Sequence, residues 1–473
     1  MKDTRNSLKM ILPMLVGLVS ITMACGEPTE NDEPGPGGTN QTNGGETPDV
    51  PTIDDVTISK VADLNPGSDA RPESFTIVGD TLYFVGHEAP RSRVWATDGT
   101  EAGTVSAFDP DDSSEIRDLV AFDGALYFAH ANRTLYSTTG TEASVEEIDE
   151  VGAMSLRILG VVGDQLIYTG GWANGRQLRA TDGTDGRSVQ EINPDSDAIE
   201  ASPHNNLAVM GGHMYFRAND GTTGWQLWRT DGTESGTTRI TDLDGHEGAG
   251  WVPAGLRTVE LDGGGEVILL AADDGEQGSQ LWMTDGTESG TEMVATINPT
   301  GNASPSNFAG LNGAVVFSAT TTGSSLDRTL WVTDGTAEGT EEIHGVALHE
   351  PFVEFNGYLY FGGEHPEQQN QVGLWRTDGT ASGTEEIAPD VTPRNFTEYG
   401  GLLFFAGDDG NSNRQLFVSD GTSQGTRVLR PEDSAEDALD TGYGASELIV
   451  FGDRLFFSAD YDGEGHQLWS LEL

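Results

Sequence analysis

One short phrase recurs along this chain, and its period limits the possible folds more than any other feature does. The phrase is an aromatic residue, two further residues and Asp-Gly-Thr. Its six complete copies begin at Trp95, Trp228, Trp282, Trp331, Trp375 and Phe417. Another copy keeps the turn at Asp182 without the aromatic residue, one keeps Tyr136 without the Asp, and the chain ends just after a ninth start at Trp469. A period of 41 to 54 residues is typical of repeat architectures such as propellers.

Four short apolar runs surround each copy of the phrase. In one unit they are 206–210, 213–216, 226–230 and 238–240, and turns of Gly, Asn and Asp separate them. In another unit Asn356-Gly357 lies between two such runs and predicts a type I′ hairpin, whose two central residues need positive φ. No long stretch has helical periodicity. Units of four short strands therefore predict an all-β fold built of propeller blades.

The two ends of the repeat region predict how the ring closes. The chain finishes with three strand-like runs, 446–450, 454–457 and 466–469, and no fourth run follows them. Residues 56–64 match the run that follows the Asp-Gly-Thr turn in other units, so we expect them to complete the last blade and leave no edge unpaired. The prediction is a single β-propeller over residues 55–473 with about nine four-stranded blades. Eight blades are the alternative, if one weak unit is misread.

Residues 1–54 precede the repeats and differ from them in composition. A basic start is followed by the apolar run 10–23, which is short for a membrane-spanning helix. Ala24-Cys25 resembles the lipobox of bacterial lipoproteins, in which the signal peptide is cleaved before a cysteine that is then acylated. We therefore predict a signal peptide at 1–24, a lipid anchor on Cys25 and a disordered tether at 25–54. An ordinary secretory signal with an incidental cysteine is the alternative.

The net charge of −53 limits the partners of the protein. With 77 acidic against 24 basic residues, nucleic acid and anionic lipid headgroups are not expected to bind directly. A repulsive, solvated surface is the simpler interpretation, and attraction of divalent cations is the alternative. Cys25 is the only cysteine, so no internal disulfide can form. We expect an exported monomer, attached through Cys25 to the bacterial envelope at the outer membrane or cell surface.

The repeat resembles that of the ELWxxDGT-repeat proteins. The family phrase is Glu-Leu-Trp-x-x-Asp-Gly-Thr-x-x-Gly-Thr, followed by an apolar strand and Asn-Pro-Gly-Ser. This chain has Asn-Pro-Gly-Ser at 65–68 and Gly-Thr at 236–237, whereas Gln usually replaces the leading Glu, as at Gln226. The resemblance covers about residues 55–473 and implies a propeller-like fold in exported bacterial proteins, many of them myxobacterial lipoproteins. It implies no ligand, because the family has no settled activity.

The repeated residues are interpreted first as structural. The aromatic side chain is expected to pack between adjacent blades, with a sugar-binding ring as the alternative. These aromatic residues are Trp95, Trp228, Trp282, Trp331, Trp375, Phe417 and Trp469. The Asp of each turn is expected to accept backbone N–H groups, with calcium ligation as the alternative. These acidic residues are Asp98, Asp182, Asp231, Asp285, Asp334, Asp378 and Asp420.

Loops between the second and third strands of a unit hold acids beside glycine. Calcium takes oxygen ligands near a turn-forming Gly, so these acids are candidate ligands, although an acidic turn without any cofactor is the simpler interpretation. The candidates are Asp273, Asp274, Asp408, Asp409, Asp460 and Asp462. In a propeller these loops share one face with the long insertions 242–251 and 431–443. Variable loops on a rigid scaffold carry binding sites, so any site is expected on that face.

The common catalytic motifs are mostly absent from the chain. It has no phosphate-binding loop and no dinucleotide-binding glycine pattern. The first hypothesis is therefore a binding or scaffold module without catalysis that contacts an envelope protein or polysaccharide. The alternative is a carbohydrate-active hydrolase or lyase with Asp or Glu at the mouth of the central channel, where two carboxyls about 5–9.5 Å apart would be needed.

Overall fold

The structure is a computed structural model. It describes residues 56–152, 156–171, 175–200, 206–243, 253–324, 328–349, 351–368, 371–408, 414–431 and 447–473. The chain divides into two compact units, Met1–Asp49 and Val50–Leu473, and all described residues belong to the second. The predicted signal peptide, the lipid anchor on Cys25 and the tether lie outside the described residues, as does Asp409. No helix in the described ranges is long and apolar enough to span a membrane.

The described strands form nine antiparallel sheets, numbered here as blades 1 to 9. Blade 1 is β2 (Glu73–Val78), β3 (Thr81–Glu88), β4 (Arg91–Thr97) and β5 (Val105–Phe108). Blade 2 is β6 (Ile116–Phe122), β7 (Ala125–His130), β8 (Thr134–Thr138) and β9 (Glu146–Glu150), with the short 3₁₀ helix η2 (Glu142–Ser144) before β9. Blade 3 is β10 (Arg157–Val162), β11 (Gln165–Gly170), β12 (Gln177–Thr181) and β13 (Arg187–Gln190). Blade 4 is β14 (Leu207–Met210), β15 (His213–Asn219), β16 (Trp225–Thr230) and β17 (Thr238–Arg239).

The second half of the chain continues the same order. Blade 5 is β18 (Ala254–Glu260), β19 (Glu266–Ala272), β20 (Gln280–Thr284) and β21 (Thr291–Ala295), and blade 6 is β22 (Ser306–Leu311), β23 (Ala314–Thr320), β24 (Arg328–Thr333) and β25 (Glu341–His344). Blade 7 is β26 (Ala347–Leu348), β27 (Val353–Phe355), β28 (Tyr358–Glu364), β29 (Val372–Thr377) and β30 (Glu385–Ala388). Blade 8 is β31 (Arg394–Tyr399), β32 (Leu402–Asp408), β33 (Arg414–Ser419) and β34 (Arg427–Leu429). Blade 9 is β35 (Leu448–Phe451), β36 (Arg454–Ala459), β37 (Gln467–Glu472) and β1 (Thr57–Ala62).

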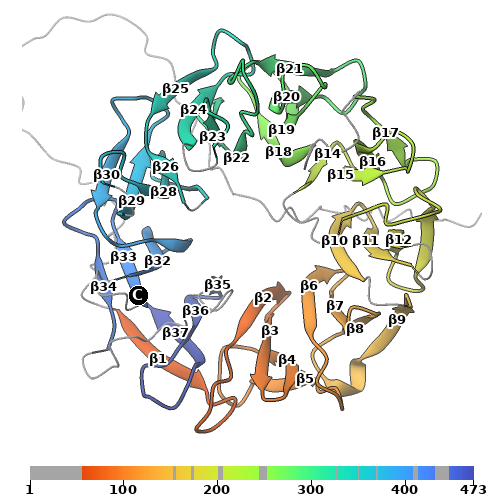
Figure 1. Ribbon diagram of the computed structural model, residues 1–473. Helices are drawn as coiled ribbons and strands as arrows, with labels where there is room; N and C mark the ends of the chain where they lie inside the picture. The colour runs from red at the N-terminus through yellow and green to blue at the C-terminus, as the bar shows by residue number, and fades with distance from the viewer. Residues whose placement is uncertain are drawn as a thin grey trace, which may run out of the picture. The chain divides into compact units, whose positions relative to one another are not determined.

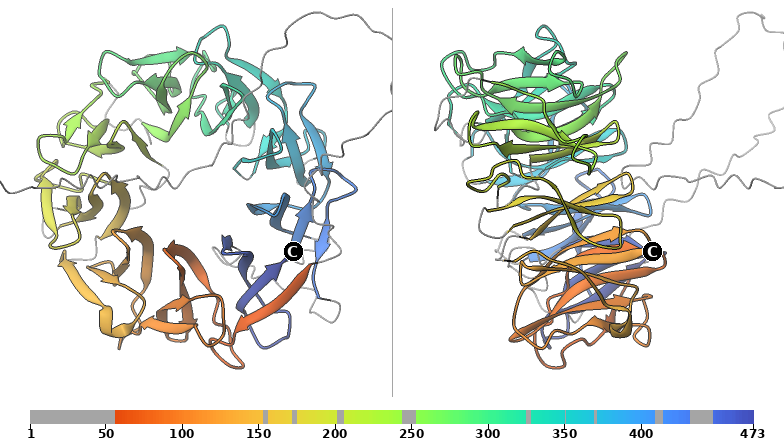
Figure 2. Two further views of the ribbon diagram at one scale, coloured as in Figure 1. Left: turned by 180° about the vertical axis from the view of Figure 1, so that it is seen from behind. Right: turned by 90° about the vertical axis from the view of Figure 1, so that its right-hand side faces the viewer.

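The nine blades stand side by side in a ring. Figure 1 shows the first strand of each blade nearest the ring axis and the fourth strand at the outer edge, and Figure 2 shows the same ring from behind and edge-on. The predicted all-β propeller of nine blades is confirmed, and the alternative of eight is wrong. Blade 7 alone among the described sheets has five strands, because β26 and β27 both pair with β28.

The N-terminal strand closes the ring as predicted. β1 pairs antiparallel with β37, from Thr57 opposite Glu472 to Lys60 opposite Trp469. Lys60 Nζ lies 2.5 Å from Asp462 Oδ2 and 3.2 Å from Glu464 Oε2, so side chains also join the strand to blade 9. The expectation that residues 56–64 complete the last blade is therefore confirmed.

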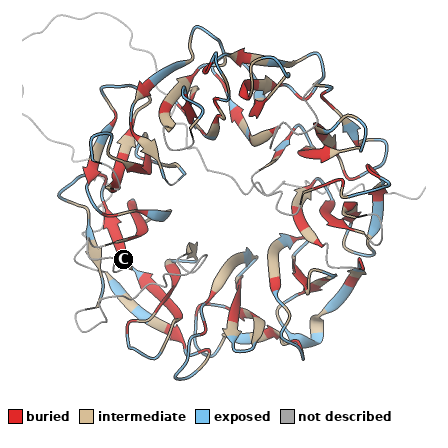
Figure 3. Ribbon diagram, viewed as in Figure 1, coloured by how far each residue is buried: buried red, intermediate tan, exposed pale blue. Residues whose placement is uncertain are grey.

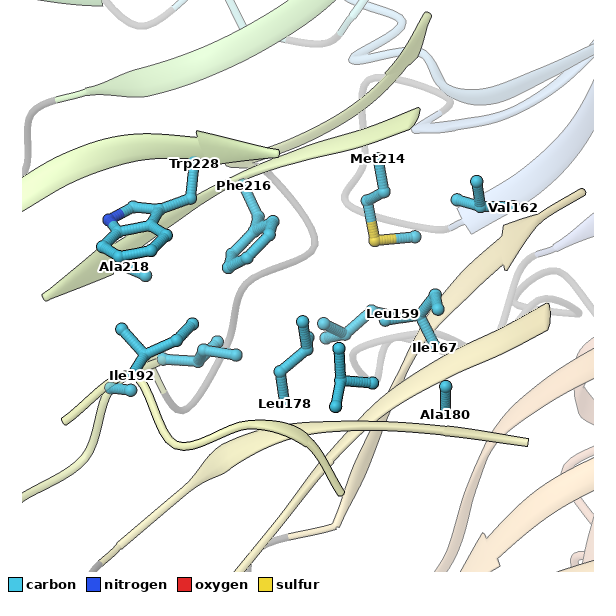
Figure 4. Packing of buried hydrophobic residues seen from close by; sticks show 13 residues of the cluster. Leu159, Val162, Ile167, Leu178, Ala180, Ile192, Met214, Phe216, Ala218 and Trp228 are labelled. Carbon is cyan, nitrogen blue, oxygen red and sulfur yellow. The ribbon is translucent and has the colours of Figure 1, made fainter. Parts of the chain in front are cut away.

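Apolar clusters between neighbouring blades form the core. Figure 3 shows the buried residues mainly in the two middle strands of the blades, and Figure 4 shows the cluster between blades 3 and 4. There Leu159, Ile167 and Leu178 of blade 3 face Phe216 and Trp228 of blade 4. Burying one such side chain contributes about 1.5–3 kcal/mol, so these interfaces stabilise the ring.

The aromatic residue of the repeated phrase belongs to these clusters. In each blade that has one, it packs in a cluster that joins its blade to the preceding blade. Trp282 of blade 5, for example, packs with Met210 and Tyr215 of blade 4. In blade 3 Arg179 takes the aromatic position, and its Nε lies 2.8 Å from Asp149 Oδ2 of blade 2. Whether it holds an aromatic residue or an arginine, this position of the third strand contacts the preceding blade.

Candidate functional site

The strand order gives the ring two faces. The loops from second to third strands, and those from each fourth strand to the next blade, emerge on one face, called here the loop face. The other two hairpins of each blade, including the Asp-Gly-Thr turns, lie on the opposite turn face. The insertions 242–251 and 431–443 belong to the loop face, and most of their residues lie outside the described ranges.

A closed hydrogen-bond network forms each complete Asp-Gly-Thr turn. In blade 4, Asp231 Oδ1 accepts the N–H of Thr233 at 2.8 Å and its hydroxyl at 2.7 Å. Thr230 Oγ1 accepts the N–H of Gly232 and bonds the hydroxyl of Thr237, which donates to the carbonyl of Thr233. Blades 1, 5, 6, 7 and 8 repeat these contacts. The hydroxyl residue before the Asp was not predicted, although its recurrence in the sequence was the available signal.

The carboxylates of these turns accept hydrogen bonds from donors within the same turn. The hydroxyl and N–H of the Thr two residues later lower the pKa of five of them, namely Asp98, Asp182, Asp231, Asp285 and Asp334. Asp378 and Asp420 accept the same two donors. Each carboxylate therefore completes its own turn.

The glycine of the turn touches the preceding blade. Gly286 has a φ of +89°, and a Cβ there would overlap the hydroxyl of Tyr215 in blade 4. Arg229 of blade 4 also donates from Nη1 to the carbonyl of Gly286 at 3.0 Å. The same arginine contact recurs from Arg187, Arg376 and Arg454 to the turns at Gly232, Gly421 and Gly99. The turns thus join blades as well as strands.

The acidic loops of the loop face are built as local turns. The described calcium candidates are Asp273, Asp274, Asp408, Asp460 and Asp462. Four of them accept an N–H from a residue two or three positions later. Asp462 also pairs with Lys60, and Asp408 lies 4.0 Å from Arg414 Nε. Within the described ranges no three His, Cys, Asp or Glu side chains form a group that could hold a metal ion. Calcium binding stays a prediction.

Asp220, in the corresponding loop of blade 4, gives the fold a pH-dependent contribution. Burial opposes ionisation, but the N–H and hydroxyl groups of Thr223 and Thr222 outweigh it and lower the pKa of Asp220 to about 2. Because the folded pKa lies below the unfolded value near 4, the stabilisation is present above about pH 4 and is lost as the pH falls towards 2. We expect Asp220→Asn to destabilise the protein at neutral pH, because the charged acceptor of these hydrogen bonds is lost. The cost should be only about 1 kcal/mol, because solvent screens charges in this loop. Melting curves should converge with wild type near pH 2; a constant difference would contradict this.

A buried glutamine holds the loop that leads to the next blade. Gln280 Oε1 accepts the N–H groups of Ile297 at 2.9 Å and Asn298 at 3.2 Å. Its Nε2 donates to the carbonyls of Gln277, Asn298 and Gly301. Gln177, Gln226 and Gln467 hold their loops in the same way. An amide can both accept and donate, whereas a carboxylate only accepts, which explains why Gln suits this position.

Replacing Gln280 by Leu should destabilise the protein by about 2–4 kcal/mol, because several buried backbone groups lose their partner. Gln415 provides the matched control. It is equally buried at the same position of blade 8, yet neither of its amide atoms has a partner among the described residues. Gln415→Leu should therefore be neutral or stabilising. Thermal melting of both variants checks this, and equal losses would refute it.

Six of the first strands carry a β-bulge at their loop-face end. These are β2, β6, β10, β18, β22 and β31. Five of the bulges contain Ser74, Asp118, Gly255, Asn307 or Asn395 with a φ between 53° and 63°. Bulges re-aim side chains and are frequent beside functional sites. The first strands lie nearest the axis (Figure 1), and the six bulged ends together with the side chains that contact them are called here the inner rim.

The inner rim links neighbouring blades through side chains. Ile158 of blade 3 donates its N–H to Asp118 Oδ2 of blade 2 at 3.1 Å, and Arg157 makes a forked contact with the same carboxylate at 2.8 and 3.1 Å. Gly255 donates its N–H to Asn206 Oδ1 at 3.0 Å. Burial, together with the charge of Arg157, lowers the pKa of Arg117. Charges of both signs therefore meet at this part of the rim.

Two carboxyls and an imidazole meet where blade 9 joins blade 1. Glu447 Oε2 accepts the N–H of Phe75 in the bulge of β2 at 3.0 Å. Burial raises the pKa of Glu447, and the charge of Glu73 raises it further against the effect of that hydrogen bond. Glu73 Oε1 lies 2.9 Å from His87 Nε2, and His87 Nδ1 lies 3.0 Å from Ser92 Oγ. No motif in the sequence marks this group, because a bulge and two hairpins assemble it.

No protein-family model and no curated protein matches this chain. Among solved structures, the computationally designed Ika8 protein aligns at 11% identity and a TM-score of 0.42, over 88% of this chain and 99% of that chain. Puromycin hydrolase aligns at 14% identity and a TM-score of 0.42, over 84% of this chain and 61% of that chain. A streptogramin B lyase aligns at 13% identity and a TM-score of 0.34, over 88% of this chain and 98% of that chain.

Proposed function

We propose that this chain is an ELWxxDGT-repeat lipoprotein of the bacterial envelope, and that its propeller is a binding or scaffold module for a polysaccharide or an envelope protein. One observation carries the proposal. The repeated residues are used up in turns and blade interfaces, whereas the polar and charged residues of the inner rim differ from blade to blade. A rim of hydrogen-bond donors, acceptors and charges of both signs suits a hydroxyl-rich ligand, and a rigid scaffold holds such groups in place.

The full chain, purified with Cys25→Ser to keep it in solution, should bind members of an array of bacterial envelope glycans. Replacing residues 242–251 or 431–443 by short Gly-Ser linkers should weaken that binding at least about tenfold. Glu288→Ala, in an exposed turn of the turn face, is the matched control and should bind as the unmodified chain does. Binding to no glycan and to no isolated envelope protein would refute the proposal, as would equal binding by the loop variants.

The anchor has its own test. Expressed with its leader, the chain should fractionate with membranes and carry an acyl mass on Cys25, and Cys25→Ser should release it to the soluble fraction. Release of the unmodified chain without detergent would contradict the proposed anchor.

A carbohydrate-active enzyme is the second candidate, and the pair Glu73 and Glu447 favours it. A carboxyl with a raised pKa close to a second carboxyl is the arrangement of a general acid and its partner. The checking measurement is release of reducing ends from envelope polysaccharide, which Glu447→Gln should abolish. Unchanged release from that variant would assign the activity elsewhere.

A further inference from the structure

Three side chains on the loop face of blade 1 form a hydrogen-bonded series. Ser92 in β4 reaches Nδ1 of His87 in β3 at 3.0 Å, and Nε2 of His87 reaches Glu73 Oε1 in β2 at 2.9 Å. His87 and Ser92 are directly opposite in the β3–β4 register, and the bulge of β2 begins at Glu73. The His87 and Glu73 side chains keep 34% and 30% of their surface exposed, so a small substrate can reach them.

The partners of His87 determine where its proton lies. With Glu73 as a carboxylate, which only accepts hydrogen bonds, Nε2 is the donor to Glu73. In neutral imidazole this leaves the lone pair on Nδ1, where it can accept the hydroxyl proton of Ser92. The roles are those of a nucleophile, a general base and an orienting carboxylate, with the two ring nitrogens exchanged relative to the serine protease triad.

The repeat does not require these residues. The register position of the pair His87 and Ser92 recurs in other blades with different residues. The corresponding pairs are Asn219 and Trp225, Thr320 and Arg328, Glu364 and Val372, and Asp408 and Arg414. All of these blades fold alike, so a structural need shared by the blades does not explain the series in blade 1. Its backbone is nevertheless held firmly, because the N–H of His87 donates to the carbonyl of Ala70 at 2.6 Å.

We propose that Ser92, His87 and Glu73 form a serine hydrolase site for uncharged acyl esters, such as O-acetyl groups. The net charge of −53 on the chain disfavours an anionic substrate. The assignment of the ester to an envelope polysaccharide rests on the proposed binding function, whereas the ester chemistry itself does not.

The reaction balances with water as the only co-reactant. Ser92 Oγ bonds to the acyl carbon while its proton moves to His87 Nδ1. The bond from the acyl carbon to the leaving oxygen then breaks, and that oxygen takes the proton from Nδ1 to leave as an alcohol. Water attacks the acyl-serine, again losing its proton to Nδ1, and the proton returns to Ser92 Oγ as the carboxylic acid departs. Glu73 holds the imidazole and stabilises its charged form throughout.

Hydrolysis of p-nitrophenyl acetate by the full chain with Cys25→Ser tests the site without any polysaccharide. Ser92→Ala and Glu73→Gln should each lower the rate at least about tenfold. Ser106→Ala, whose hydroxyl bonds Glu142 rather than a histidine, is the matched control and should leave the rate unchanged. An alkyl fluorophosphonate should add one mass increment to the unmodified protein, on the peptide that contains Ser92.

Two results would overturn the proposal: an unchanged rate in Ser92→Ala, or a phosphonate adduct absent from Ser92. If Ser92→Ala fails to fold, Ser92→Cys replaces it, since the Cys25→Ser background has no other thiol. That thiol should react with iodoacetamide at neutral pH at least about tenfold faster than the thiol of Ser106→Cys, because His87 promotes the thiolate. Equal rates would also refute the site. Loss of glycan binding with retained ester hydrolysis would count against the proposed function alone.

Discussion

Removing residues 56–64 lowers the melting temperature of this protein by at least about 5 °C and makes it associate in solution. The deletion takes away β1. Val61 and Ala62 of this strand, and Leu64 just after it, are buried in the apolar cluster between blades 9 and 1. Their burial and the lost strand pairing together contribute about 5 kcal/mol. The deletion also leaves β37 as an unpaired edge, and such edges pair with other chains. Melting curves and sedimentation at several concentrations check both effects.

A synthetic peptide of residues 56–64 should restore about half of the lost stability. Strand addition to an open edge recovers the main-chain hydrogen bonds, and at a hundredfold excess over its dissociation constant the peptide would restore about 2.7 kcal/mol. The same peptide with Val61→Asp is the control and should not restore the melting temperature. A deleted chain that melts like the full chain would mean that the ring does not depend on β1.

The architecture was predictable because each blade repeats the same local signals. The aromatic phrase counts the blades, and the apolar runs and hairpin residues around it mark the strands. Ring closure was predictable from one comparison, the match between residues 56–64 and the strand after each turn. These signals are local in sequence, and a repeat fold is built from local units whose contacts reach only their neighbours.

The inner rim could not be predicted, because its contacts join residues that are far apart in the sequence. A bulge shifts the register by a residue, and one residue of shift decides which face a side chain occupies. Glu73, Ser92 and Glu447 are brought together by the bulge of β2, a hairpin and the closure of the ring. The same holds for the contact of Gly286 with Tyr215, since the sequence shows a turn glycine but not the neighbouring blade it meets. The calcium candidates could not be assigned from the sequence either, because acidic residues beside Gly form simple turns as well as calcium sites.

The division between the two faces follows from these contacts. The turn face carries the residues that recur from blade to blade, and a change there acts on stability. The inner rim carries residues that differ between blades, and a change there can alter binding or chemistry while the frame persists. Variants on the two faces should therefore separate in experiment: turn-face variants in the melting temperature, rim variants in affinity or rate.

Gly286→Ala should destabilise the protein by about 2–5 kcal/mol. An L-residue at its φ of +89° costs about 1–2 kcal/mol, and overlap with the Tyr215 hydroxyl adds about 1–3 kcal/mol. Gly263→Ala separates the two terms. Gly263 has a φ of +74° and no atom within 4 Å of an added Cβ. Gly263→Ala should therefore cost only about 1–2 kcal/mol, the part that comes from the backbone angle.

A double variant isolates the contact between blades. Tyr215→Phe removes the hydroxyl that the added methyl would strike, so the loss caused by Gly286→Ala should shrink in that background by about 1 kcal/mol or more. Combined with Gly263→Ala, Tyr215→Phe should show no such coupling, because nothing lies near that methyl. Thermal melting of the three single and two double variants measures both couplings. If Gly286→Ala and Gly263→Ala cost the same stability and neither coupled to Tyr215→Phe, the turn would need glycine for its backbone angle alone, and the approach of Gly286 to Tyr215 would not matter for stability.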